Sequence, residues 1–189
     1  MPSLRAATWA SHQQLEKRID FKARLETIGT YREHIQRLWG FYVPMEERLC
    51  CGVLDPWIRD FTVRAKAPML ARDILSLGAD PSVFAALPCC RQLPPCPDPE
   101  TAFGCAYVLE GATLGGQSLL PVVHKRLGLT LHRGAAFLAS YGDAVADMWR
   151  EFGAALERCC STREKRDRAA RAAAATFQAL ELWLCGEPS

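Results

Sequence analysis

A histidine lies on the apolar face of the first predicted helix. Leu4, Thr8, His12, Leu15 and Ile19 follow one another at steps of three and four residues, which places them on one side of an α-helix. A histidine in such a stripe is most often a core residue with a hydrogen-bond partner, but a neutral imidazole is also the commonest side-chain ligand of metal ions. His12 is therefore the first candidate ligand.

A second unusual feature is the stretch FGCAYVLEGATLGGQSLLP, which reads as a core helix but contains Gly104, Gly111, Gly115 and Gly116. Each glycine inside a helix costs roughly 1 kcal/mol relative to alanine. Gly104, Gly111 and Gly115 are predicted to share one face, where the missing Cβ atoms let a flat group lie close to the backbone. The glycines also predict a kink. For an isolated G-x-x-x-G pattern, close packing of a neighbouring helix is the alternative interpretation.

The two features together suit one ligand. An imidazole on one helix and bare backbone on another would hold a planar porphyrin between them, so the sequence predicts a haem site. The other histidines, His34, His124 and His132, lie beside charged residues and are expected at the surface or in loops. A carboxylate-bridged di-iron site is disfavoured, because the sequence has no Glu-x-x-His spacing.

The elements that must position these residues are predicted to be helices, because sustained two-residue alternation is almost absent. We expect an all-α fold in a single domain spanning residues 1–189. A capping box at Thr30 and Glu33 is expected to start the helix that bends at Pro44, and another at Ser161 and Glu164 to start the last helix. The remaining predicted helices begin near residues 55–56, 68 and 80–81, span residues 98–127 with Gly128 as the C-terminal glycine, and cover residues 134–159.

Composition excludes several classes of protein. The formal net charge is only +2 with both signs interspersed, so neither a nucleic-acid groove nor a polybasic membrane anchor is indicated. No apolar run has the length of a membrane span, and the first residues lack the pattern of a signal peptide, so a cytoplasmic location is expected. The nine cysteines include three adjacent pairs and no C-x-x-C, which favours free thiols.

The motifs carry a family resemblance. LRAATWASHQQLE near the N-terminus and YVLEGATLGGQ in the glycine-rich helix both resemble signatures of bacterial haem oxygenases. FYVPMEERL, FLASYGDAVADMWREF and AAAATFQALELWL agree in the expected order, so the resemblance covers nearly the whole chain. The chain is most similar to the type associated with bacterial phytochromes.

This resemblance implies a compact multi-helix fold in which His12 is the proximal iron ligand and the helix through Gly111 and Gly115 lies on the distal side. The implied reaction cleaves haem, which is both substrate and cofactor, with O2 and electrons from an external donor such as a ferredoxin or a reductase. Its products are biliverdin, CO and ferrous iron. A bacteriophytochrome that receives the biliverdin is a further expected partner.

Further site residues follow from their places in these motifs. Arg5 and Arg150 are expected to hold the haem propionates, Lys125, Arg126, Arg133 and Tyr141 are additional candidates, and Gly116 and Phe177 are expected to contact the ring. One position departs from the better-known animal enzymes, which carry an aspartate directly after the first distal glycine, where this chain has Ala112. Thr113, Glu110 and Gln117 are alternative residues to order the distal water. A carrier that binds haem or a bilin without degrading it stays open as the alternative function.

Overall fold

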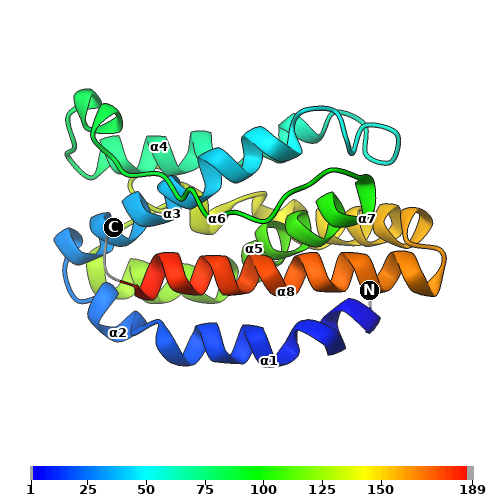
Figure 1. Cartoon of the computed structure of the whole chain (residues 1–189). Helices are drawn as coiled ribbons and strands as arrows, with labels where there is room; N and C mark the ends of the chain where they lie inside the picture. Colours follow the sequence, from blue (N-terminus) through cyan, green and yellow to red (C-terminus); the bar gives the residue numbers. More distant parts are fainter. Residues whose placement is uncertain (1, 187–189) are drawn as a thin grey trace.

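The computed structural model describes residues 2–186, and within this range the chain is helical (Figure 1). No strand is assigned among these residues; only isolated bridges occur, from Thr130 to Arg133 and Gly134. The all-α prediction is therefore confirmed. In chain order the elements are α1 (Pro2–Arg18), α2 (Phe21–Arg24), α3 (Ile28–Leu49), the 3₁₀ helix η1 (Phe61–Arg64), α4 (Ala67–Ser76), η2 (Pro81–Ala85), α5 (Pro99–Leu127), α6 (Ala136–Ala139), η3 (Gly142–Ala144), α7 (Val145–Cys159) and α8 (Arg163–Cys185).

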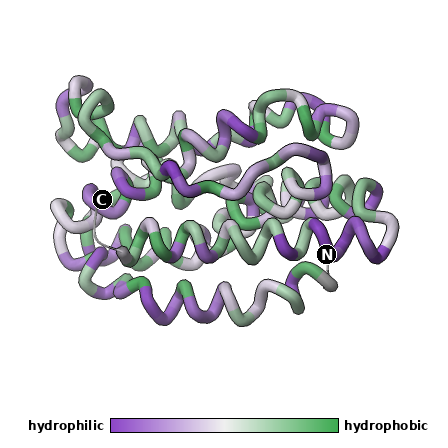
Figure 2. Tube along the Cα trace, viewed as in Figure 1, coloured by the Kyte–Doolittle hydropathy of each residue, from purple (hydrophilic) through white to green (hydrophobic). Residues whose placement is uncertain are grey.

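The long helix α8 organises the core. It packs most extensively against α5 on one side and α1 on the other, while α6 and α7 cover α5 and α4 packs on α3. Figure 1 shows α8 running alongside α1 through the middle of the molecule. Polar and apolar segments alternate along both helices in Figure 2, as expected for helices that bury one face each. This arrangement leaves α1 and α5 as the two helices that can face each other across a ligand.

Helix α1 buries the predicted stripe. Leu4, Thr8, Leu15 and Ile19 are all buried, whereas the His12 side chain, in the middle of the stripe, is 46% exposed. Burial of these apolar side chains against α8 fixes the rotation of α1 about its axis. His12 is thereby held on the inner side of the helix without being covered by protein.

Helix α5 begins and ends where the sequence predicts. The Asp98 side chain accepts a hydrogen bond from the Thr101 backbone N–H, Pro99 occupies the first turn, and Gly128 closes the helix with a φ of +66°. Asp80 caps η2 in the same way, through the Ser82 backbone N–H. Local capping chemistry therefore set these boundaries correctly.

Two predicted capping boxes lie at neighbouring residues instead. Helix α3 starts three residues earlier than predicted, because Thr27 accepts from the Thr30 backbone N–H and Thr30 in turn bonds the Thr27 backbone. Helix α8 is capped by Thr162, whose hydroxyl accepts from the Lys165 backbone N–H, rather than by Ser161. At the start of α3 both threonines therefore take part in one capping box, whereas at the start of α8 Thr162 occupies the cap position beside Ser161.

Two predicted helices differ more strongly. Residues 51–60 form turns rather than a helix that starts near residue 55. The helix expected over residues 134–159 is divided into α6, η3 and α7. Ser140 and Gly142 have φ values of +45° and +57°, and a right-handed helix cannot continue through such residues. Predicting this as one helix was therefore wrong.

Candidate functional site

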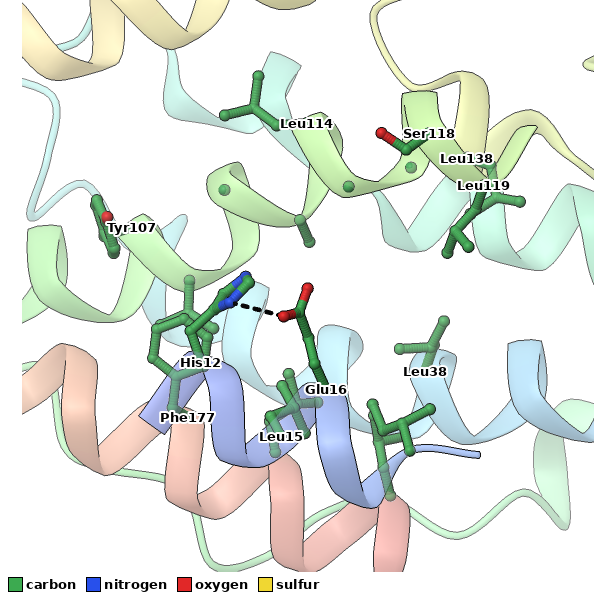
Figure 3. A pocket seen from close by; sticks show the side chains of 18 of the residues that line it. His12, Leu15, Glu16, Leu38, Tyr107, Leu114, Ser118, Leu119, Leu138 and Phe177 are labelled. Atoms are coloured by element: carbon green, nitrogen blue, oxygen red, sulfur yellow. Dashed lines mark ion pairs between the residues drawn. The ribbon is translucent and has the colours of Figure 1, made fainter. Parts of the chain in front are cut away.

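A cavity of about 720 Å³ lies between α1 and α5 and extends to α3, α6, α7 and α8. A volume of this size matches sites that enclose small molecules and cofactors, about 300–1,000 Å³. Most of its lining is apolar, with a few polar side chains placed at separate points. Figure 3 shows the cavity with α1 below and α5 above, Tyr107 toward one end and Leu38 toward the other.

His12 enters this cavity from α1. Figure 3 shows its ring rising toward α5, with a dashed line from the imidazole to Glu16. The distance from His12 Nδ1 to Glu16 Oε2 is 3.5 Å, across one helical turn. Phe177 of α8 packs edge-on against the imidazole, with ring centroids 5.7 Å apart. A carboxylate beside Nδ1 favours a proton on that nitrogen, which leaves Nε2 as the atom free to bind a metal.

Bare backbone lies on the α5 side of the cavity. Gly111, Gly115 and Gly116 line it. A Cβ built at Gly115 would meet nothing within 4 Å, and one at Gly111 would touch only the Trp149 ring, at 3.7 Å. These two glycines therefore leave space in the cavity that any other residue would reduce.

The remaining glycines of this helix serve packing. A Cβ at Gly104 would collide with the Ala169 backbone of α8, and Gly104 does not line the cavity. A Cβ at Gly116 would lie 2.7 Å from the Leu138 carbonyl oxygen of α6. The prediction that Gly104 faces the ligand together with Gly111 and Gly115 is therefore wrong, and close helix packing explains Gly104 instead.

A cation and a phenol meet at one end of the cavity. Arg5 and Tyr107 both line this end. Burial raises the pKa of Tyr107, while contact with the Thr8 hydroxyl and the positive charge of Arg5 partly oppose this shift. Tyr107 was not predicted from the sequence, although its place one turn before Gly111 on the same helix is a signal that could have indicated it. The pair forms a place where a carboxylate of a ligand could be held.

Several predicted site residues lie elsewhere. Arg150 is exposed and pairs with Asp147 at 2.5 Å, while its neighbour Trp149 lines the cavity. One residue along a helix is a rotation of about 100°, and here Trp149 faces the cavity while Arg150 faces solvent. The Thr113 hydroxyl donates to the Glu110 backbone carbonyl at 2.7 Å, and the Gln117 amide donates to the Ala139 carbonyl at 3.0 Å. Other candidates that do not line the cavity are Glu110, Lys125, Arg126, Arg133 and Tyr141.

Glu110 belongs to a buried ionic cluster behind the cavity wall. Its carboxylate contacts Lys66 Nζ, accepts from Arg64 at 2.8 Å and accepts from the Tyr141 hydroxyl at 2.7 Å. Arg64 also reaches Glu151, at 2.8 Å. Burial lowers the pKa of Lys66, and the neighbouring Glu110 carboxylate opposes that shift. The cluster fixes the turn of α5 that leads directly into Gly111.

His34 lies in a different place from the one predicted. It is 7% exposed, lines the cavity and has its Nδ1 2.9 Å from an Arg24 guanidinium nitrogen. Burial, followed by the charges of Arg24 and Arg37, lowers its pKa to about 3. The expectation of a surface or loop histidine is therefore wrong, because tertiary packing of α2 and α8 covers this part of α3. At neutral pH the ring is uncharged.

Ala112, which stands where the better-known animal enzymes carry an aspartate, lines the cavity. Tyr42 and Ser118 also line the cavity and carry hydroxyl groups. Burial raises the pKa of Tyr42, and the negative charges of Glu46 and Glu110 raise it further, so its phenol stays protonated and able to donate.

The chemistry of other metal sites is not assembled in the part of the chain that the structure describes. Residues 2–186 contain no group of three or more His, Cys, Asp or Glu side chains placed to hold a metal ion, as a di-iron centre would require. All nine cysteines are free thiols, as predicted. Within the same residues no helix has the length and apolarity to cross a membrane.

The residues present fit a haem group. One imidazole nitrogen is free on one side, the opposite wall lacks side chains at Gly111 and Gly115, the remaining walls are apolar, and a cation lies at one end. The fold and the site together define a helical protein that encloses a flat, largely apolar ring carrying acidic groups, between an imidazole and helix backbone.

The comparisons with known proteins place the chain in a family. The family model described as heme oxygenase matches residues 1–184. A heme oxygenase of Xanthomonas campestris pv. campestris (strain 8004) is 30% identical over 156 residues, which are 82% of this chain and 87% of that protein. The chain therefore belongs to the haem oxygenase family, whose enzymes degrade haem.

Solved structures show the same fold. Heme oxygenase from Leptospira interrogans superimposes with a TM-score of 0.78 at 20% identity, covering 96% of both chains. The NO- and CO-bound heme oxygenase from Neisseria meningitidis gives 0.75 at 20% identity, covering 96% of this chain and 87% of that one. At this identity the structures support the arrangement of helices, and the residue roles have to be argued from the site itself.

Proposed function

We propose that this chain binds haem through Nε2 of His12 and degrades it, using O2 and electrons from an external donor, to biliverdin, CO and ferrous iron. The observation that carries the proposal is the opposition, across one cavity, of the His12 imidazole and the open faces of Gly111 and Gly115. When bound, haem would supply both the iron that activates oxygen and the ring that is oxidised.

His12 and Glu16 form the proximal side of the proposed haem site. The carboxylate 3.5 Å from Nδ1 stabilises a proton there and makes Nε2 a better electron donor to iron. Phe177 packs against the imidazole and restricts its rotation. His12 would be the protein's ligand to the haem iron, and the iron would supply the oxygen chemistry.

On the distal side, Gly111 and Gly115 give room for a small ligand between the ring and the helix. Because a side chain at either position would fill this space, the two glycines keep the α5 backbone as the cavity wall on this side. The methyl side chain of Ala112 can neither donate nor accept a hydrogen bond. We assign the ordering of distal water to the hydroxyl groups that line the cavity, those of Tyr42 and Ser118.

The propionates are assigned to the end lined by Arg5 and Tyr107. A guanidinium and a phenol can each donate a hydrogen bond to a carboxylate, and the bond from a cation is the stronger kind. Arg150, the other arginine proposed from the sequence, faces solvent with Asp147 and lacks a place in the cavity wall. Arg5 and Tyr107 therefore fix which edge of the ring lies at this end.

The partners follow from the reaction rather than from a surface of the chain. The reaction needs an electron donor, for which a ferredoxin or a reductase is proposed, and it releases biliverdin, which a bacteriophytochrome could receive. Both partners rest on the resemblance to the bacterial enzymes, and the cytoplasmic location stays the prediction made from the sequence.

Haemin titration tests the proposal with a matched pair of variants. The parent, His12→Ala and His132→Ala are mixed with haemin, and visible spectra are recorded in air after adding ascorbate and catalase, which removes free peroxide. We expect a histidine-ligated complex that converts to biliverdin with release of CO in the parent and in His132→Ala, whose histidine is exposed and outside the cavity. His12→Ala should lose the ligation spectrum and turnover.

The same experiment distinguishes the alternative. A haem complex of the parent that survives reduction in air would show a haem or bilin carrier. The replacement of the expected aspartate by Ala112 is the observation that favours this second candidate. A parent that binds no haem contradicts both functions.

A further inference from the structure

The end of the cavity away from Arg5 is almost wholly apolar. Arg5 and Ile19 both line the cavity and are fourteen residues apart on the α1 side, about 21 Å at the rise of an α-helix. Around Ile19 the lining is made by Phe21, Leu38 and Leu184. Two polar side chains also lie at this end: Ser118, on the same side of Figure 3 as Leu38, and His34, which is more than nine-tenths buried.

The contacts of His34 settle where its proton lies. An Arg24 guanidinium nitrogen lies 2.9 Å from Nδ1, and another nitrogen of Arg24 donates to the Leu184 carbonyl at 2.6 Å. A guanidinium can only donate hydrogen bonds, so Nδ1 must accept and the single proton of the neutral ring is on Nε2. The neutral form is secured by burial, which lowers the pKa of His34 to about 3.

The Nε2–H group is left without a protein acceptor. Within residues 2–186, Arg24 is the polar group that hydrogen-bonds His34, and the closest ring neighbour is Phe21, edge to face at 6.1 Å. His34 Nε2 is not among the fully buried atoms that lack a partner, so its N–H is open to the cavity, where a ligand can bring an acceptor. The cavity therefore presents, at a largely apolar end, an N–H donor that Arg24 holds in a fixed orientation.

Haem itself offers nothing to this donor, but the product does. This step rests on the proposed function. With its propionates at Arg5 and Tyr107, the porphyrin turns toward His34 the edge that bears only hydrocarbon groups. Opening of the ring replaces a bridging carbon by two lactam carbonyl oxygens, and these are strong acceptors. We propose that His34 Nε2–H donates a hydrogen bond to a lactam carbonyl oxygen of the bilin product.

His34 is then a product-recognition residue rather than a haem ligand. It distinguishes the open-chain tetrapyrrole from the closed ring by an interaction that only the former can make. It retains biliverdin in the cavity after the iron is lost, so its removal speeds product release.

Separate titrations of the full, metal-free chain with biliverdin IXα and with haemin test the proposed hydrogen bond from His34. We expect His34→Leu to weaken biliverdin binding roughly three- to tenfold, which corresponds to about 0.7–1.4 kcal/mol, and to leave haemin binding unchanged. His34→Gln, which keeps an N–H donor at a similar position, should recover most of the biliverdin affinity. His132→Leu is the matched control and should match the parent for both ligands.

Equal biliverdin affinity of His34→Leu and the parent, or an equal loss for both ligands, overturns the proposal. A measurement on the parent covers the case in which His34→Leu does not fold. In a ¹⁵N-histidine-labelled sample, the Nε2–H signal absent from His34→Gln should move on addition of biliverdin, and an unmoved signal also overturns the proposal. Failure of haem degradation in the parent would refute the proposed function, whereas the biliverdin titration would still report on His34.

Discussion

The buried cluster around Glu110 offers the sharpest test of how the distal helix is held. In Glu110→Gln the side chain keeps its volume but loses the charge that faces Arg64 and Lys66, whose side chains are 1% and 2% exposed. Removing one partner of a buried ion pair typically costs about 3–5 kcal/mol, because an uncompensated charge stays buried. Here two cations lose their shared partner.

The surroundings place the expected cost at the lower end of that range. Arg64 keeps Glu151 at 2.8 Å, and Lys66 keeps the Arg64 carbonyl and the Tyr141 hydroxyl, each at 2.7 Å. We therefore expect a loss of about 3 kcal/mol, a large part of the 5–15 kcal/mol that stabilises a typical domain. For a chain of this size, each kcal/mol lowers Tm by about 2–4 °C, so the expected decrease is about 6–12 °C.

Thermal unfolding followed by circular dichroism measures this decrease, with Glu47→Gln as a control because Glu47 is exposed. The control should stay within about 0.5 kcal/mol of the parent. The double variant Glu110→Gln with Lys66→Met should be more stable than Glu110→Gln alone, because it removes one of the stranded cations. A decrease in Tm of less than about 2 °C for Glu110→Gln, equal to that of the control, would refute the reasoning.

Three further predictions concern the cavity. Gly115→Ala should raise Tm slightly, because alanine is favoured by about 1 kcal/mol within a helix and its Cβ would meet nothing within 4 Å. Gly115→Leu should abolish haemin binding in a spectroscopic titration, because its side chain fills the cavity, and it should retain the circular dichroism spectrum of the folded parent. Arg5→Ala should weaken haemin binding by roughly tenfold through loss of a charged hydrogen bond, and Arg150→Ala should leave it unchanged. The pKa of His34 is about 3 in the folded state and near 6.5 in the unfolded state. Its contribution to the free energy of unfolding is therefore complete above pH 6.5. As the pH falls from 6.5 toward 3, this contribution decreases by about 1.4 kcal/mol per pH unit. Urea unfolding at several pH values should show this slope as a difference between the parent and His34→Leu, and its absence would contradict the assignment of a buried neutral ring.

Features that depend on interactions between residues close together in the chain could be predicted from the sequence. The ends of α5 were predictable because Asp98, Pro99 and Gly128 act on backbone groups within a few residues. The buried stripe of α1 was predictable because its period is that of the helix. The break at Ser140 was not, because a non-glycine residue with positive φ gives no compositional signal.

Interactions between distant segments escaped the sequence analysis for a related reason. Glu110 was considered as a residue that orders distal water, and nothing in its local sequence shows that Arg64 and Lys66, more than forty residues earlier, occupy both of its oxygens. His34 was assigned to the surface because its sequence neighbours are charged. Only the packing of α2 and α8 against α3 reveals that it is enclosed.

The glycines of α5 show why a site had to be recognised from two features rather than one. Gly104 and Gly116 allow the backbones of α8 and α6 to approach, whereas Gly111 and Gly115 leave open space, yet all four have the same identity and lie in the same helix. Close packing at Gly116 also shapes the cavity. It lets Leu138 of α6 approach α5 closely, and Leu138 forms part of the apolar cavity wall. A glycine pattern alone therefore cannot separate helix packing from ligand binding. The histidine on the facing helix supplied the distinction, since only a ligand between the two helices makes use of both.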